Sequence, residues 1–178
     1  MDVANAVRRA LPRARSDAER QTADAAFASV VAPIYPDLVR RLVLVLGDIE
    51  EARDVAQDAS LQAWQAWDRF DGVNPRGWLY TIALRLAFNR LRSRQRWLRA
   101  VHRVEPRPWA DAADPDLWQA LGVLDPRVRA ALLLQVVDGY TQAEIAAMLG
   151  VPSGTIASWS TRGRATVRRV LEGGEGHS

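Results

Sequence analysis

One segment near the C-terminus presents hydroxyl and arginine side chains at a spacing that suits contact with DNA. If residues 153–172 form a helix, one face and its flank carry Thr155, Ser158, Thr161, Arg162 and Arg164. Short hydroxyls and arginine hydrogen-bond to base edges in the major groove, and flanking arginines bind phosphates. This pattern predicts a surface that reads double-stranded DNA.

The residues just before this face predict a helix-turn-helix. Thr141 is followed three residues later by Glu144, which is the arrangement of a capping box at the start of a helix. Gly150 ends that helix, and Pro152 and Ser153 begin the next one. A short apolar helix, a glycine turn and a second capped helix are typical of DNA-binding domains, although an ordinary helical hairpin has the same outline.

Trp159 lies in the middle of the helix that would enter the groove. Its neighbour Ser160 and, three residues later, Gly163 occupy the expected core side, and both are too small to fill a core. We therefore expect the indole to pack across the gap that they leave. Projection of the indole towards DNA is the alternative.

A second basic region lies near the middle of the chain. No acidic residue occurs between Asp71 and Glu105, whereas eight arginines do: Arg76, Arg85, Arg90, Arg92, Arg94, Arg96, Arg99 and Arg103. The chain has no lysine, so arginine enrichment alone is equally well explained by the base composition of the coding genome. The local clustering, in a chain of net charge only +3, suits a polyanion because each neutralised phosphate releases counterions.

Several kinds of chemistry are not expected. The chain has no cysteine, its two histidines lie far apart at His102 and His177, and no carboxylates have the spacing of metal ligands. No nucleophile is paired with a base and no glycine-rich loop suits a phosphate, so we expect neither catalysis nor a cofactor. No apolar run approaches the roughly 20 residues of a membrane span, and no signal peptide is apparent. We therefore expect a cytoplasmic protein.

Helical periodicity accounts for most of the chain, and no segment alternates as a strand does. Helices are expected at residues 22–32, 36–46, 48–67, 75–99, 115–123, 125–137, 141–149 and 153–172. The predicted fold class is all-α, with two small helical domains joined by a Pro-rich linker, the second containing the helix-turn-helix.

The linker is expected where "RVEPRPWADAADPD" holds three prolines and no helical period. The expected boundaries are a mobile N-terminal tail at residues 1–20, a first domain at 21–102, the linker at 103–116, a second domain at 117–172 and a flexible tail at 173–178.

Both halves of the chain resemble parts of one protein family. The stretches "GDIEEARDVAQDASLQAW" and "FDGVNPRGWLYTIALRLAFNRLRSRQR" closely resemble the second conserved region of bacterial RNA polymerase sigma factors. The stretch "ALGVLDPRVRAALLLQVVDGYTQAEIAAMLGVPSGTIASWSTRGRATVRR" resembles their fourth region. The resemblance covers about residues 25–172, and the two-domain size is similar to that of the small extracytoplasmic-function (group 4) sigma factors.

The resemblance implies roles for both domains in promoter recognition, promoter opening and transcription initiation. The first domain would bind core RNA polymerase, at the clamp helices of its largest subunit, through Asp54, Gln57, Asp58 and Leu61. It would also capture the minus-ten promoter element through Phe70, Asn74, Arg76, Arg85, Asn89 and Arg92. The second domain would contact the flap of the second-largest subunit and read the minus-thirty-five element through the helix face described above.

The chain departs from the family's usual pattern at four positions. Ala157 and Trp159 stand where basic residues are usual, Ser160 stands where an aliphatic residue is usual, and Arg85 stands where asparagine is common. Two alternatives therefore remain: a helix-turn-helix regulator that acts without polymerase, and a polymerase-binding decoy with impaired promoter reading. An anti-sigma factor is a further partner that the resemblance implies for many relatives.

Overall fold

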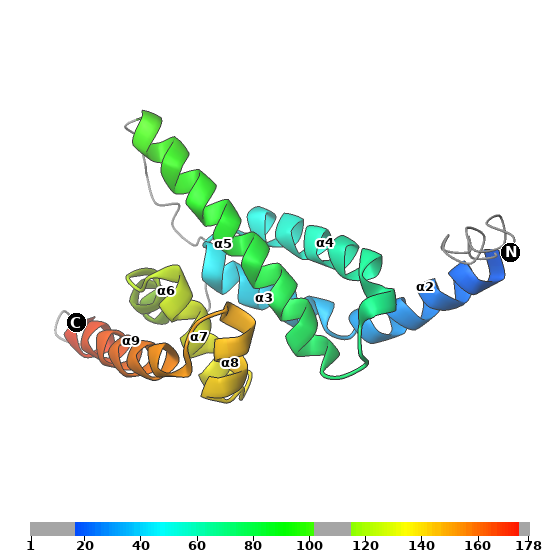
Figure 1. Ribbon diagram of the computed structural model, residues 1–178. Coiled ribbons are helices and arrows are strands. Elements are labelled where there is room, and N and C mark those ends of the chain that lie inside the picture. Colours follow the sequence, from blue (N-terminus) through cyan, green and yellow to red (C-terminus); the bar gives the residue numbers. More distant parts are fainter. Residues whose placement is uncertain (1–16, 102–114, 175–178) are drawn as a thin grey trace, which may run out of the picture.

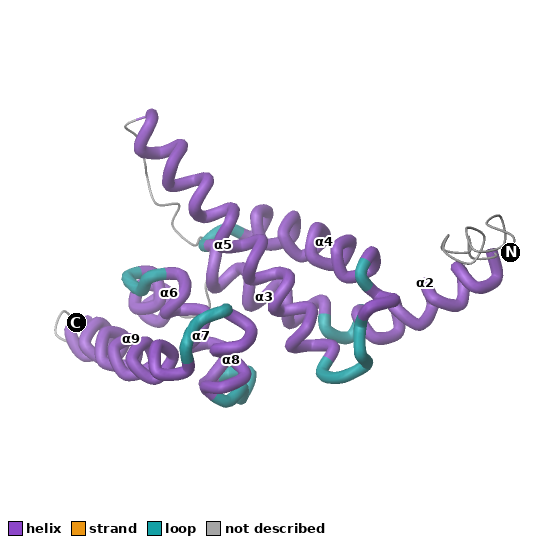
Figure 2. The backbone as a smooth tube through the Cα atoms, in the orientation of Figure 1, coloured by secondary structure: helices purple, strands orange, loops and turns teal. Residues whose placement is uncertain are grey.

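The computed structural model describes residues 17–101 and 115–174, and every regular element in these ranges is helical (Figures 1 and 2). The first group is α2 (Asp17–Val31), α3 (Tyr35–Leu46), α4 (Ile49–Gln65), the short 3₁₀ helix η1 (Trp67–Arg69) and α5 (Pro75–Val101). The second group is α6 (Pro115–Gly122), α7 (Pro126–Val136), α8 (Gln142–Leu149) and α9 (Ser153–Gly174). The all-α prediction is confirmed for these residues. Most of the expected linker and of both tails lies outside the described residues.

Local sequence determines where α3 ends and α4 begins. Pro36 lies in the first turn of α3, where its missing N–H costs no hydrogen bond. Gly47 ends α3 at a φ of 84°, a left-handed conformation that favours glycine. The Asp48 carboxylate then accepts hydrogen bonds of 2.9 Å from the backbone N–H groups of Glu50 and Glu51, and so caps α4.

The first domain is built on α3, α4 and α5, which pack against one another. α4 turns a row of fully buried alanines towards its neighbours, namely Ala52, Ala56, Ala59 and Ala63. Such small side chains allow close approach of the helices, and the buried leucines of α3 complete the core. The opposite side of α4 is thereby turned to solvent.

The second domain consists of α6 to α9, with α9 packed against the other three helices. Gly163 of α9 faces α7 so closely that a Cβ at this position would lie 3.1 Å from Cγ1 of Val128 and 3.7 Å from Cδ2 of Leu132. Thus α7 occupies the space beside Gly163 that we expected the indole of Trp159 to cover. Trp159 itself is half-buried and packs against the core, in agreement with a structural role.

The two domains are in contact and share one hydrophobic core. α3 packs on α7, and α5 packs on α8 (Figure 1). Leu42 and Val45 of α3 line the same narrow apolar cleft as Leu133 and Leu134 of α7. The sequence did not predict this contact, because helical periodicity marks which faces are buried but not which partner buries them.

Arg129 of α7 ties the second domain to the end of α3. It is only 8% exposed, and its guanidinium donates hydrogen bonds to the carbonyl oxygens of Leu44 (3.2 Å) and Val45 (3.3 Å). The same group donates to the carbonyl oxygens of Gly122 (3.1 Å) and Leu124 (3.0 Å). The last carbonyl groups of a helix lack partners within the helix and attract cations. The second domain therefore supplies part of the C-terminal cap of a helix in the first domain.

Candidate partner-binding and nucleic-acid surfaces

One face of α4 is an exposed stripe formed by Asp54, Gln57, Asp58 and Leu61, which we call the α4 stripe. Leu61 is 55% exposed although it is apolar. Asp54 accepts a hydrogen bond of 3.2 Å from Arg90 of α5 in an exposed ion pair. An apolar side chain among carboxylates on a rigid helix suits contact with a helix of another protein. The structure brings together all four residues that the sequence assigned to this surface.

Phe70 lies in an aromatic cluster in the loop before α5. Its ring stacks on Trp78 at a centroid distance of 4.5 Å and on Trp67 at 5.4 Å. Phe27 of α2 meets Trp67 edge-on, also at 5.4 Å. Phe70 is half-buried, so only part of the residue is accessible for the contact with the minus-ten element predicted for it.

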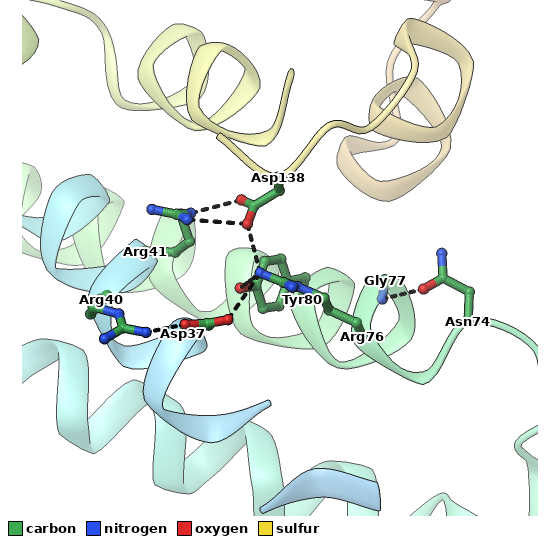
Figure 3. Close-up of polar contacts among 8 residues, drawn as sticks. All are labelled: Asp37, Arg40, Arg41, Asn74, Arg76, Gly77, Tyr80 and Asp138. Carbon is green, nitrogen blue, oxygen red and sulfur yellow. Dashed lines mark hydrogen bonds and ion pairs between the residues drawn. The ribbon is translucent and has the colours of Figure 1, made fainter. Parts of the chain in front are cut away.

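Asn74 begins α5. Its backbone is left-handed, with a φ of 47°, and its side-chain oxygen accepts a hydrogen bond of 2.9 Å from the N–H of Gly77 (Figure 3). The side chain nevertheless remains exposed. Asn74 thus has a structural role as a helix cap in addition to the DNA contact predicted for it.

Arg76, on the first turn of α5, lies between two carboxylates (Figure 3). One of its terminal nitrogens, Nη2, lies 2.8 Å from Asp138 and 3.3 Å from Asp37, and it donates to the hydroxyl of Tyr80 at 3.3 Å. Burial lowers the pKa of Arg76, but the Tyr80 contact and the two carboxylates outweigh burial, and the pKa is raised. Arg76 is therefore already bound by this chain's own acidic groups.

Three further predicted DNA contacts, Arg85, Asn89 and Arg92, are exposed along α5. Arg85 donates a hydrogen bond of 3.2 Å to Gln62 of α4, and Arg92 donates to the side-chain oxygen of Asn89. Arg85 and Arg92 also line a groove whose other wall includes Met148 of α8. This side of α5 therefore faces the second domain.

The predicted capping box is present at the start of α8. The Thr141 hydroxyl accepts a hydrogen bond of 3.3 Å from the N–H of Glu144, whose carboxylate accepts one of 2.8 Å from the N–H of Thr141. These contacts from Thr141 lower the pKa of the Glu144 carboxyl. Gly150 ends α8 at a φ of 64°, and α9 starts three residues later. The helix-turn-helix geometry agrees with the prediction.

The predicted DNA-reading face of α9 is accessible. Four of its residues, Ser158, Thr161, Arg162 and Arg164, are exposed, and Thr155 is half-buried. Arg164 donates a hydrogen bond of 3.0 Å to Gln135 of α7, which fixes its direction relative to the helix. Hydroxyl and guanidinium groups on an open helix face suit base edges and phosphates.

Sequence reasoning missed Asp138 and Arg41. Asp138 lies in the loop between α7 and α8, and its side chain is 0% exposed. Its carboxylate accepts hydrogen bonds from Arg41 of α3 at 2.7 and 3.2 Å as well as from Arg76 (Figure 3). In the sequence, "DGY" indicates only a turn, so no signal pointed to a buried acid that joins two domains.

Among the residues that the structure describes, no group of three or more His, Cys, Asp or Glu side chains is placed to hold a metal ion. None of the helices within the same ranges is both long and apolar enough to cross a membrane.

Two family models match the chain, one in each domain. The model of Sigma-70 region 2 matches residues 30–97, and that of Sigma-70, region 4 matches residues 115–167. The chain is 31% identical over 168 residues to the ECF RNA polymerase sigma factor SigW of Bacillus subtilis, an alignment that covers 82% of this chain and 89% of that protein. It is 27% identical over 167 residues to the RNA polymerase sigma-H factor of Pseudomonas aeruginosa, with 83% and 86% covered.

Solved structures with a similar fold include complexes of two proteins. The sigma factor RpoE in complex with the anti-sigma factor NepR from Bartonella quintana matches with a TM-score of 0.71 and 25% identity. That match covers 82% of this chain and 96% of the other. CnrH in complex with the cytosolic domain of CnrY matches with a TM-score of 0.63 and 26% identity, covering 86% of this chain and 94% of the other.

Proposed function

The chain belongs to the extracytoplasmic-function sigma factors of bacterial RNA polymerase. We propose which of its surfaces bind the polymerase and which bind promoter DNA. As a sigma factor, it binds core RNA polymerase and directs promoter recognition and transcription initiation. Sigma factors are not enzymes, so we assign no catalytic residue, metal or cofactor. We place the protein in the cytoplasm, where the polymerase works.

The α4 stripe is the proposed docking surface for the clamp helices of the largest polymerase subunit. Its support is the exposure of Leu61, about one helical turn beyond Asp58, on a helix whose other face is fixed by buried alanines. Burial of an exposed leucine by a partner helix contributes favourable binding free energy. The nearby carboxylates can pair with cationic groups of the partner and so fix its orientation.

The loop before α5 and the exposed side of α5 form the proposed surface for the minus-ten element, which we call the minus-ten face: Phe70, Asn74, Arg76, Arg85, Asn89 and Arg92. Single-stranded DNA is held by cationic groups that follow the phosphates and by aromatic rings that stack on bases. The partly accessible ring of Phe70 and the exposed arginines of α5 suit these two contacts.

The face of α9 formed by Thr155, Ser158, Thr161, Arg162 and Arg164 is the proposed reader of the minus-thirty-five element. Support comes from its exposure on the second helix of a helix-turn-helix, which is the helix that enters the major groove in this motif. We further propose that the second domain contacts the flap of the second-largest polymerase subunit.

An anti-sigma factor is a proposed regulatory partner. The support is that similar solved structures include a sigma factor in complex with an anti-sigma factor. A protein of that kind would compete with polymerase for this chain.

The observation that carries the function is that both sigma regions occur in order and over most of the chain. Run-off transcription with core RNA polymerase on sheared DNA of the source bacterium, with and without the protein, tests it. Discrete new transcripts that depend on the protein are expected. Core binding without transcripts would favour the decoy alternative, and DNA binding without core binding would favour a regulator that acts without polymerase.

A further inference from the structure

A groove beside the contact of α5 with α8 is lined by three arginines and, among the described residues, by no acidic side chain (Figure 1). Arg85 and Arg92 come from α5, and Arg127 comes from the first turn of α7. The other lining residues are Thr81 and Phe88 of α5 and, at the end of α8, Ala147, Met148, Leu149 and Gly150. We call this site the α5–α8 groove.

The two α5 arginines are accessible and their partners are uncharged. Both side chains belong to exposed residues. Arg85 donates a hydrogen bond of 3.2 Å to the amide oxygen of Gln62, and Arg92 donates to the amide oxygen of Asn89. An amide leaves the charge of a guanidinium uncompensated, so both groups attract an anionic ligand.

Arg127 adds a third cation from the second domain. Its guanidinium carbon, Cζ, lies 5.4 Å from the ring centroid of Phe88, which holds the side chain over the groove by a cation–π contact. The acids closest to the groove residues in sequence, Asp125 and Glu144, cap the N-termini of α7 and α8. Three cations of one sign thus meet in the groove from two domains.

The α8 wall of the groove is apolar and ends in hydrogen-bond acceptors. Met148 and Leu149 are half-buried there. The last carbonyl groups of a helix lack partners within the helix. The N–H groups of Gly150 and Val151 both donate to the carbonyl oxygen of Ala146, so the later carbonyl groups of α8 receive neither of them. This wall suits a flat apolar ring that carries N–H donors on its edge.

From these two walls we infer that the α5–α8 groove binds a purine nucleotide with two or more phosphates. The phosphates bind Arg85, Arg92 and Arg127, since guanidinium groups form paired hydrogen bonds with phosphate oxygens. The base lies on Met148 and Leu149, with its N–H groups towards the carbonyl end of α8. The groove has a volume of about 290 Å³, close to the lower limit of about 300 Å³ for ligand pockets, and so has room for one mononucleotide.

A nucleotide in the groove opposes DNA binding by α5. Arg85 and Arg92 belong to the proposed minus-ten face, and the same N–H groups cannot bind a nucleotide and a DNA phosphate together. Arg127 belongs to the second domain and lies outside that face. The competition therefore rests on the proposed function, whereas the nucleotide site itself does not.

The test uses the full chain and the fluorescent N-methylanthraniloyl derivative of GDP, whose binding is followed by fluorescence anisotropy. Arg127→Gln removes one phosphate contact, and Arg168→Gln removes the same charge at an exposed position of α9 outside the groove. Ala147→Glu places a carboxylate in the groove from an exposed helix position, and Gln142→Glu places one elsewhere on α8. Far-ultraviolet circular dichroism checks that all four variants remain helical.

Arg127→Gln and Ala147→Glu should each weaken binding of the probe at least about tenfold, which is the effect of losing one charged hydrogen bond. The two control variants should stay within about twofold of the parent chain, because solvent and salt screen a distant exposed charge. Inorganic pyrophosphate should displace the probe at least about tenfold less well than GDP does, because it has no base to bury against the apolar wall.

Three outcomes would overturn the inference. They are no binding of the probe, equal losses in the control variants, and displacement by pyrophosphate as effective as that by GDP. The last of these would indicate a site for phosphate alone.

A fluorescein-labelled single-stranded oligonucleotide of random sequence separates the nucleotide site from the proposed function. GDP should reduce binding of this oligonucleotide to the parent chain, and should do so at least about tenfold less effectively in Ala147→Glu. Groove-dependent GDP binding that leaves oligonucleotide binding unchanged would support the nucleotide site and count against the function proposed for the minus-ten face. The two failures are therefore distinguishable.

Discussion

The carboxylate of Asp138 meets the guanidinium of Arg41 through two hydrogen bonds, of 2.7 Å from Nε and 3.2 Å from Nη2, although the residues are 97 positions apart. A double-mutant cycle with Asp138→Asn and Arg41→Gln should give a coupling free energy of about 1–3 kcal/mol in urea unfolding. The physical reason is that each single change removes the same partly buried ion pair, while Arg76 still binds residue 138, so the second change costs less than it would alone. Additive effects of the two changes would contradict a direct interaction.

The buried Arg129 should be more important for stability than any exposed arginine. Burial lowers the pKa of Arg129, with the charge of Asp125 opposing that effect, yet its guanidinium bonds to four backbone carbonyl groups. Arg129→Met would leave these carbonyls unsatisfied, and we expect a loss of about 2–4 kcal/mol in the free energy of unfolding. Arg53→Met, at an exposed position on α4, should change it by less than about 0.5 kcal/mol.

The α4 stripe should depend on its leucine for binding to polymerase. Leu61→Glu is expected to weaken binding to core RNA polymerase at least about tenfold, because a charge would replace the apolar group that a partner helix covers. Ile49→Glu is the matched control, since Ile49 is 44% exposed on the same helix but lies outside the stripe. Fluorescence anisotropy of the labelled protein measures both affinities, and equal losses in the two variants would contradict the assignment.

Ala157 should limit upstream DNA binding. Ala157 is half-buried beside the proposed reading face of α9, at a position where the resemblance to the family implies a basic residue. Ala157→Arg in the full chain is expected to raise affinity for the upstream element about tenfold at fixed salt, as one added arginine contact would. Ala25→Arg adds the same charge on α2 and should have no such effect, so an equal gain there would indicate only a non-specific attraction.

Two tyrosines at the domain contact should make stability sensitive to alkaline pH. Burial raises the pKa of both Tyr80 and Tyr140, whose rings lie 6.5 Å apart. Because the folded-state pKa is the higher one, stability is fully present below about pH 10, the ordinary tyrosine pKa, and is lost as pH rises from there through the folded-state values. Urea unfolding in this range, followed together with phenolate absorbance, measures the decline, and Tyr140→Phe should make it shallower.

The sequence predicted which face of each helix is exposed better than it predicted how the two domains contact each other. The helical period placed Leu61 and Asp58 outside and the alanines of α4 inside, because one helix determines that geometry by itself. The capping box at Thr141 was predicted correctly for the same reason, because it involves only Thr141 and Glu144. The start of α2 was predicted at residue 22, but the helix begins at Asp17, where the added first turn is polar and gives no apolar period.

The contact between domains required information that no local pattern contains. In the sequence Arg76 was predicted only as a DNA contact, Arg41 had no assigned role, and Asp138 was part of a turn. Their common site arises only when α3, α5 and the loop after α7 come together. Phe70 shows the same limit at shorter range, since its stacking on Trp78 depends on the path of the loop between them.

The last backbone carbonyl groups of α3 accept hydrogen bonds from three different parts of the chain. The carbonyl group of Val43 is bound by the N–H of Gly47, those of Leu44 and Val45 by Arg129, and that of Leu46 by Arg94. Without the contact from the second domain, the carbonyl groups of Leu44 and Val45 would lose their partner, and the last turn of α3 would fray more often. This turn leads directly into α4, which carries the α4 stripe. By thermodynamic reciprocity, a ligand on α4 that rigidifies this junction would strengthen docking of the second domain, and one that loosens the junction would help release it.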